Sequence, residues 1–114
     1  MLRTQIEGSG TLKGERTPVE GRDEDLVLDD IKETRVVLNL LVRGLVDEPD
    51  DVRVNVVRGA QSIIYEVSAH PDDMRKVIGR KGRTADAIRE LLNGLGGRVR
   101  LRYLLEIIEP PNRT

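Results

Sequence analysis

Cysteine is absent from this 114-residue chain. Its absence excludes disulfide bonds, cysteine-based zinc sites and thiol catalysis. No window approaches the roughly 18 consecutive apolar residues of a membrane-spanning helix, and the N-terminus has no apolar segment of the signal-peptide kind. We therefore expect a soluble, unsecreted protein without a membrane partner. The length predicts one domain with a modest core.

Aromatic residues are nearly as scarce, because the chain has two tyrosines and neither phenylalanine nor tryptophan. This scarcity argues against RRM-type and OB-type binding, in which nucleic-acid bases stack on aromatic side chains. We expect the two tyrosines, Tyr65 and Tyr103, to pack in the core or at a sheet edge.

Signatures of catalysis and of metal binding are also missing. The chain has no Gly-x-x-x-x-Gly-Lys-[Ser/Thr] run, which argues against a nucleotide-dependent enzyme. The single histidine, His70, has no nucleophile near it in sequence and is expected to cap a helix or lie on the surface. The acidic residues at 47–51 do not have the spacing of a calcium loop. We expect no catalytic residue, no metal and no cofactor.

Charge is abundant but unevenly distributed along the chain. The formal net charge is only −1. Residues 75–102 nevertheless carry nine basic and two acidic side chains, whereas residues 29–73 carry five basic and ten acidic ones. A chain polarised in this way presents one face to polyanions although its total charge is near zero.

The first half of the chain predicts an extension, a helix and two strands. Residues 1–28 show no lasting period and are expected to be a mobile extension, with one apolar cluster at 26–28 that could dock against the domain. A helix should begin at Asp29 or Asp30, because Asp30 and Glu33 resemble a capping box, and it should end before Pro49. Its expected apolar face is Val37, Leu38, Leu41, Val42 and Leu45. Alternating residues at 52–56 and 62–69 then predict two strands joined by a hairpin turn.

The second half predicts two helices and a last strand. Pro71 suits the first position of a short helix, which Gly79 to Gly82 interrupts. A longer helix should run from about Arg83 to Leu95, and a strand from Arg98 to Glu109. Alternation in that strand places three cations on its outer side, where we expect a solvated face rather than a ligand contact: Arg98, Arg100 and Arg102. The order helix, strand, strand, helix, helix, strand predicts an α+β fold whose three-stranded sheet has its helices on one face.

The most informative stretch is the interruption between the two helices. Gly79 and Gly82 bracket two cations, Arg80 and Lys81, and Arg83 follows. Glycine permits close approach of a backbone to a ligand, and the N-terminus of the following helix favours an anion. Turn glycines alone would explain the two glycines but not the cations between them. This stretch therefore predicts a grip on a sugar-phosphate backbone.

In this setting the Gly-x-x-Gly loop resembles that of a KH domain of the type II arrangement. The run from Pro71 to Thr84, followed by Ala87-Ile88-Arg89, is similar to the bacterial single-KH RNA-binding proteins of the KhpA (YlqC) family. The turn at 44–50 matches the family's acidic entry into the first strand, so the resemblance covers roughly residues 31–109. It divides the chain into an extension at 1–28, which is unusual for the family, a KH domain at 29–110 and a tail at 111–114.

The resemblance implies a non-enzymatic protein that holds single-stranded RNA. Gly79 and Gly82 would allow close approach, and the bases would rest on Ile78 and Ile88. Five basic residues complete the expected site: Arg75, Lys76, Arg80, Lys81 and Arg83. Two cations inside the loop, where the family commonly has one, should raise phosphate affinity and salt sensitivity more than base preference.

The resemblance also implies a wider biology. It suggests an RNA chaperone or post-transcriptional regulator in the bacterial cytoplasm, linked to cell elongation, cell shape and cell wall organisation. The expected protein partner is a second copy or a KH/R3H-domain protein of the KhpB (Jag) type. The alternative is a protein-interaction subunit, whose KH fold serves mainly for dimerisation and has little RNA affinity of its own.

Overall fold

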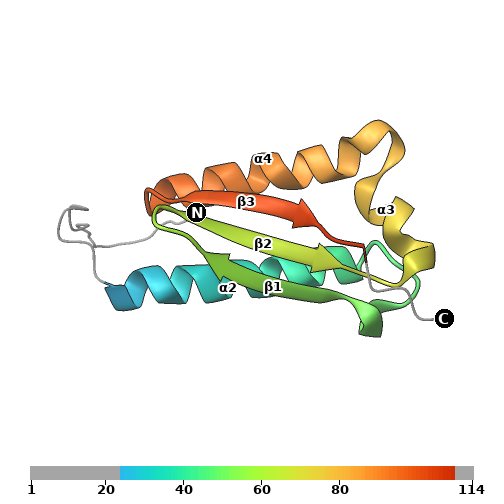
Figure 1. Ribbon diagram of the computed structural model, residues 1–114, viewed down its shortest axis with the longest axis horizontal. Helices are drawn as coiled ribbons and strands as arrows, with labels where there is room; N and C mark the ends of the chain where they lie inside the picture. Colours follow the sequence, from blue (N-terminus) through green and yellow to red (C-terminus); the bar gives the residue numbers. More distant parts are fainter. Residues whose placement is uncertain (1–23, 110–114) are drawn as a thin grey trace, which may run out of the picture.

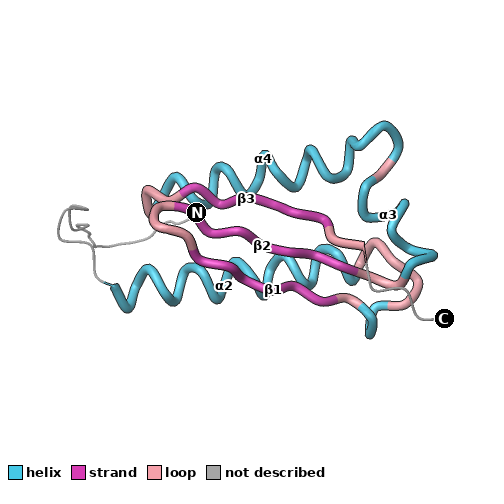
Figure 2. The backbone as a smooth tube through the Cα atoms, viewed as in Figure 1, coloured by secondary structure: helices cyan, strands magenta, loops and turns pink. Residues whose placement is uncertain are grey.

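A computed structural model describes residues 24–109. Within these residues, three helices, three short 3-10 turns and three strands follow one another (Figures 1 and 2). In order they are α2 (Glu24–Arg43), η2 (Pro49–Asp51), β1 (Arg53–Arg58), β2 (Ser62–Ser68), η3 (Pro71–Asp73), α3 (Met74–Ile78), η4 (Arg80–Gly82), α4 (Arg83–Arg98) and β3 (Arg102–Ile107). The predicted order of helices and strands is confirmed.

The strands form one mixed sheet in the order β1-β2-β3. β1 pairs with β2 antiparallel and β2 pairs with β3 parallel, with Ile64 opposite both Val57 and Leu104. Alternate strand residues are buried, such as Ile63, Tyr65 and Val67 in β2. Both long helices lie behind the sheet in the view of Figure 1. The predicted α+β layering, with helices on a single face, is confirmed.

The first helix begins earlier than the sequence predicts. It starts at Glu24 instead of Asp29 or Asp30, so residues 24–28 belong to the helix and not to an extension. The reason is burial: Val27 is only 3% exposed and continues the core stripe that leads to Ile31. Residues 1–23 and the expected tail at 111–114 lie outside the described residues.

Asp30 does not act as the predicted helix cap. It lies inside α2, and its carboxylate accepts hydrogen bonds from the Tyr103 hydroxyl and from Arg98, both at 2.5 Å. The residue therefore ties α2 to the end of α4 and to β3, a tertiary role that the local pattern with Glu33 concealed.

The predicted apolar face of α2 is only partly the buried one. Leu38 and Val42 are in the core, but Val37, Leu41 and Leu45 are 39–49% exposed. The helix has an apolar surface wider than the core requires. The predicted face was therefore shifted round the helix by part of a turn.

The two tyrosines pack in the core as expected. Tyr65 and Tyr103 are 0% and 2% exposed, and their rings meet edge to face with centroids 5.3 Å apart. The Tyr65 hydroxyl donates to the carbonyl of Ile31 at 3.3 Å. Burial raises the pKa of both phenols above the ordinary value. Neither ring is available to stack on a base.

The end of α4 and the start of β3 differ from the prediction. The helix continues to Arg98 and the strand begins only at Arg102. Arg100 has a positive φ of 59° in the turn between them. Arg98, Arg100 and Arg102 therefore do not share one strand face, and Arg98 is held by Asp30.

A further glycine lets the two elements pack. A Cβ added at Gly96 would lie 2.5 Å from the Leu101 carbonyl oxygen and 3.0 Å from the Tyr103 ring. The last turn of α4 can therefore lie directly against β3.

Within residues 24–109, no helix combines the length and apolarity that crossing a membrane requires.

Candidate nucleic-acid interface

The Gly79–Gly82 loop joins α3 to α4 at one end of the molecule (Figure 1). The Gly79 N–H donates to the Arg75 carbonyl at 2.8 Å and closes α3. The Gly82 N–H donates back to the Gly79 carbonyl at 3.0 Å, which makes the loop a single tight turn. The loop is therefore built by its own backbone and by the two helices.

The two glycines are required for different reasons. Gly79 has a φ of 84° and a ψ of 167°, and a Cβ there would lie 2.3 Å from Thr84 Oγ1 and 2.7 Å from the Thr84 nitrogen. Gly82 has a φ of 74°, but a Cβ there would meet no atom within 4 Å. Gly79 is thus required by contact and by conformation, and Gly82 by conformation alone.

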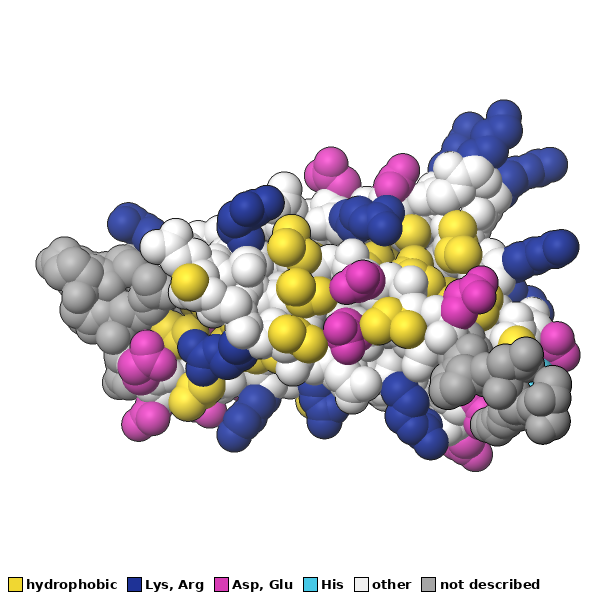
Figure 3. Space-filling view, viewed as in Figure 1, with side chains coloured by type: hydrophobic (Ala, Val, Ile, Leu, Met, Phe, Trp, Pro, Cys, Tyr) yellow, Lys and Arg dark blue, Asp and Glu magenta, His cyan; other side chains and the backbone are white. Residues whose placement is uncertain are grey.

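The cations of the loop are unpaired. Arg75, Arg80, Lys81 and Arg83 are exposed and form no ion pair with any residue between 24 and 109. Dark blue side chains project into solvent at the end of the molecule where α3 and α4 meet (Figure 3). No side chain caps the first turn of α4, so its backbone N–H groups face the same region. The site offers full and partial positive charge to an anion.

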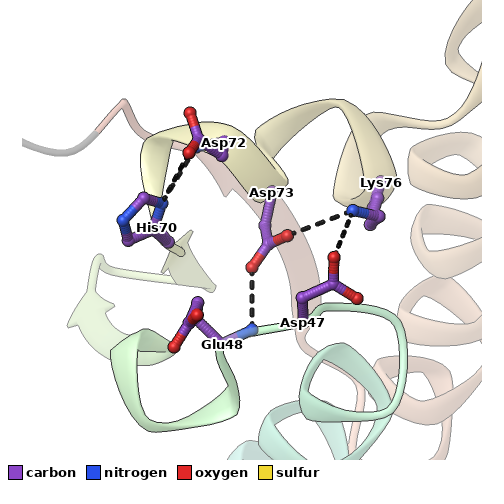
Figure 4. Close-up of polar contacts among 6 residues, drawn as sticks. All are labelled: Asp47, Glu48, His70, Asp72, Asp73 and Lys76. Carbon is purple, nitrogen blue, oxygen red and sulfur yellow. Dashed lines mark hydrogen bonds and ion pairs between the residues drawn. The ribbon is translucent and has the colours of Figure 1, made fainter.

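Lys76, which was expected among the RNA-binding cations, lies elsewhere. Its ammonium group is 2.9 Å from Asp47 Oδ2 and 3.3 Å from Asp73 Oδ1 (Figure 4). Hydrogen bonds to these two carboxylates raise the pKa of Lys76. The structure therefore does not bring Lys76 to the loop, and its charge is already neutralised.

Asp73 is the buried centre of this cluster. It is 1% exposed, and its second oxygen accepts the Glu48 N–H at 3.0 Å. Burial alone would raise the pKa of Asp73, but the backbone N–H groups of Glu48 and Asp47, together with Lys76, hold it below its usual value. The carboxylate anchors α3, and with it the loop, to the segment that follows α2.

The expected role of His70 is confirmed. Its Nδ1 accepts a hydrogen bond from the Asp72 N–H at 3.1 Å and caps the 3-10 turn before α3. Figure 4 shows it on the far side of Asp72 from the lysine. The described residues contain no group of three or more side chains able to hold a metal ion.

A groove of about 440 Å³ begins at the loop and runs between the two helices and the edge of the sheet. Ile78, Leu105 and Ile107 contribute its apolar lining, and Arg89, Glu106 and Glu109 its charged lining. Ile78 is 40% exposed and is well placed to support a base. Ile88, the other expected support, is 5% exposed and belongs to the core, so it offers almost no surface to a ligand.

The edge of β3 adds backbone groups to this groove. The Arg102 N–H donates to the carbonyl of Gln61, just before β2, and the Ile108 N–H donates to that of Val67 in β2. The backbone N–H and C=O groups of the even-numbered residues of β3 therefore face β2. Backbone groups alternate between the two edges of a strand. Those of Tyr103, Leu105 and Ile107 therefore face the outer edge, where N–H and C=O groups are open to a ligand.

A second hollow of about 450 Å³ continues along α4 and β3. Asp86, Glu90 and Asn93 line it on the helix side. Arg89 lines both hollows and is held by Asp86 at 3.0 Å. The sequence pattern did not reveal these residues, because the side of α4 that faces β3 depends on how the helix packs. The alternation of Leu105 and Ile107 was the one local signal of the groove.

Comparison with known proteins gives a consistent result. The family model described as the KhpA/KhpB KH domain matches residues 35–107, which include the loop and all three strands. This is a family of KH domains and not of enzymes. No solved structure gives a significant match.

Several curated relatives bear the name RNA-binding protein KhpA. The chain is 59% identical over 58 residues to that of Mycobacterium tuberculosis (strain ATCC 25618 / H37Rv), covering 51% of this chain and 72% of the relative. It is 53% identical over 64 residues to that of Streptomyces coelicolor, covering 54% and 77%. It is 44% identical over 72 residues to that of Chlamydia pneumoniae, covering 63% and 92%.

Proposed function

The chain belongs to the KhpA/KhpB KH-domain family, and from this premise we propose that it binds single-stranded RNA through the Gly79–Gly82 loop. Phosphates lie against the loop and the first turn of α4, and bases enter the groove beside β3. The contacts to phosphate come from Arg80, Lys81 and Arg83, with Arg75 one helical turn before the loop. The names of the relatives support RNA as the ligand.

The observation that carries this proposal is the unpaired charge of the loop. Six of the ten other cations of the described chain are engaged by carboxylates or backbone carbonyls, and Lys32, Arg58, Arg100 and Arg102 are not. The loop is distinguished by four such unpaired cations within nine residues of the chain, where they repel one another. A cluster of cations is unfavourable in the free protein and becomes favourable when phosphates neutralise it.

Affinity should be modest and dependent on salt. The loop and α4 contact only a few phosphates, and each neutralised phosphate adds about 0.7 to the slope of log affinity against log salt for a single strand. Without aromatic stacking, which contributes about 1–3 kcal/mol per base elsewhere, the groove holds bases by apolar contact and hydrogen bonds.

A pair of charge-matched variants tests the loop. Arg80→Gln with Lys81→Gln should abolish most binding of a fluorescent RNA oligonucleotide in an anisotropy titration. Arg58→Gln with Arg102→Gln removes the same net charge from exposed strand positions and should leave binding nearly unchanged. Equal losses in both variants would mean that net charge and not the loop governs binding, and undiminished affinity in the first would refute the assignment.

A second candidate function is a protein contact on the helical layer. Six aliphatic side chains of α2 and α4 are 44–63% exposed, and all but Val36 lie toward one flank of their helix: Leu26, Val37, Leu40, Leu41 and Leu91. Their helical positions place them on the flanks by which α2 and α4 face each other, where Asp30 meets Arg98. A contiguous exposed apolar patch of this kind marks an interaction surface. A second copy, or a KH/R3H-domain protein of the KhpB type, is the proposed partner.

The resemblance supports a broader version of the RNA proposal. In it the protein acts in the cytoplasm as an RNA chaperone or post-transcriptional regulator, and its loss alters cell shape and cell wall organisation. Crosslinking in cells followed by sequencing of bound RNA tests this. Enrichment of specific transcripts, lost in the Arg80→Gln, Lys81→Gln strain, is the expected result; recovery of no RNA above background would refute it.

A further inference from the structure

The groove contains uncompensated negative charge. Glu106 and Glu109 line the hollow next to the loop, and neither forms an ion pair with a residue of the described chain. The one basic residue of the lining, Arg89, is held by Asp86. Both residues therefore lie at a site whose other end is built to attract phosphate. Glu106 is exposed and alternates with Leu105 and Ile107, so its carboxylate lies at the rim of the hollow, on the sheet face away from the helices.

These carboxylates determine which part of a nucleotide can enter. A phosphate placed in the hollow would meet like charge, so the sugar-phosphate chain must stay at the loop. The apolar lining of Ile78, Leu105 and Ile107 accepts the flat face of a base instead. A bound strand consequently presents its base edges to Glu106 and Glu109.

A carboxylate accepts hydrogen bonds but donates none. Cytosine presents an amino donor at the position where uracil has an acceptor oxygen, and carboxylates accept from that amino group in other complexes. We propose that Glu106 and Glu109 make the groove select bases that carry an amino group and disfavour uracil. This inference rests on the proposed RNA binding and adds to it the base preference, which the loop alone does not determine.

A matched control lies on the neighbouring strand. Glu66 of β2 is directly opposite Glu106 of β3 in the parallel register. It has the same charge, but it does not line either hollow. Removal of the Glu66 charge changes the local field without removing an acceptor from the groove.

The experiment compares oligocytidine and oligouridine of equal length by fluorescence anisotropy at one salt concentration. The two pyrimidines differ little in size and share the same backbone. The natural protein should bind oligocytidine about fivefold more tightly, the low end of what one good base contact contributes. Glu106→Gln with Glu109→Gln should bring the ratio of the two dissociation constants close to one, and Glu66→Gln should leave it unchanged.

Other outcomes would overturn the inference. A ratio near one in the natural protein would show that the groove does not read the amino group. A ratio unchanged in Glu106→Gln, Glu109→Gln, with both oligonucleotides bound more tightly, would show that the carboxylates only repel the backbone. Either result leaves RNA binding itself intact, whereas failure to bind both oligonucleotides would refute the proposed function and the inference with it.

Discussion

Replacement of Gly79 by alanine should damage the loop far more than the same change at Gly82. The φ of 84° and ψ of 167° at Gly79 form a backbone conformation that is essentially reserved for glycine. Any other residue in this conformation is destabilised by about 1–3 kcal/mol. The added Cβ would also lie 2.6 Å from the Thr84 Cβ and 2.7 Å from its backbone nitrogen. Both of these atoms are fixed to the backbone at the start of α4, so rotation of the Thr84 side chain cannot relieve the overlap.

The expected loss of stability follows from these two contributions. For Gly79→Ala we expect at least about 3 kcal/mol, since strain and backbone overlap add. Gly82 is in the left-handed region and open to solvent, so Gly82→Ala should cost about 1–2 kcal/mol. At about 4–8 °C per kcal/mol for a domain of this size, the two melting temperatures should differ clearly.

The measurement is urea or thermal unfolding followed by far-ultraviolet circular dichroism, with RNA affinity determined in parallel. Thr84→Ala removes the nearest clashing atom, Oγ1, but leaves the Cβ and nitrogen, so it should restore only part of the loss in Gly79→Ala. Equal destabilisation by Gly79→Ala and Gly82→Ala would refute the reasoning, because it would mean that the contact with Thr84 does not exist in solution.

Three further predictions concern the anchor, the core and the helical layer. Asp73→Asn should lower the melting temperature at neutral pH, because it removes the negative charge beside Lys76 and leaves one acceptor oxygen where the Glu48 N–H and Lys76 now use two. Since the pKa of Asp73 is lowered in the folded state, its stabilisation is present above the unfolded pKa of about 3.9 and is lost as the pH falls through the lower folded value. Asp73→Asn should therefore show a shallower loss of stability with acid in a pH series of thermal melts, and an identical slope would contradict the assignment. Leu38 is 1% exposed and Leu40 is 62% exposed. In urea titrations of the dilute protein, Leu38→Ala should lower the free energy of unfolding by about 2–5 kcal/mol and Leu40→Ala by under about 0.5 kcal/mol. Leu40→Glu should abolish self-association in sedimentation while RNA binding persists, and an unchanged sedimentation profile of a self-associating protein would exclude the helical layer as the contact.

Much of the fold could be predicted from local pattern. Period-two alternation placed β1 and β2, and Gly79 with Gly82 marked the break between α3 and α4. The errors fell where burial extended an element beyond its local signals. Burial of Val27 lets α2 begin before its apparent cap at Asp30. Close packing of Gly96 against Tyr103 accompanies a longer α4, which occupies the first residue of the expected last strand.

The candidate site was predicted only where its chemistry is local. Arg80, Lys81 and Arg83 are close together in the chain, so the sequence is enough to assign a common positive charge to them. Lys76 and Ile88 could not be assigned in the same way. Their composition suits a binding site, but Asp47 and Asp73 engage the first and the core encloses the second.

The sequence by itself determined the order of helices and strands, the cationic glycine loop and the family, because each depends on residues close together in the chain. Only the tertiary structure decided that Gly79 meets Thr84, that Lys76 is neutralised, and that Glu106 and Glu109 line the groove. These facts depend on the distance between side chains of different elements, which packing sets and local period does not. The roles that we propose divide in the same way: neighbours in sequence would hold the backbone of a nucleic acid, whereas residues that meet only on folding would contact its bases.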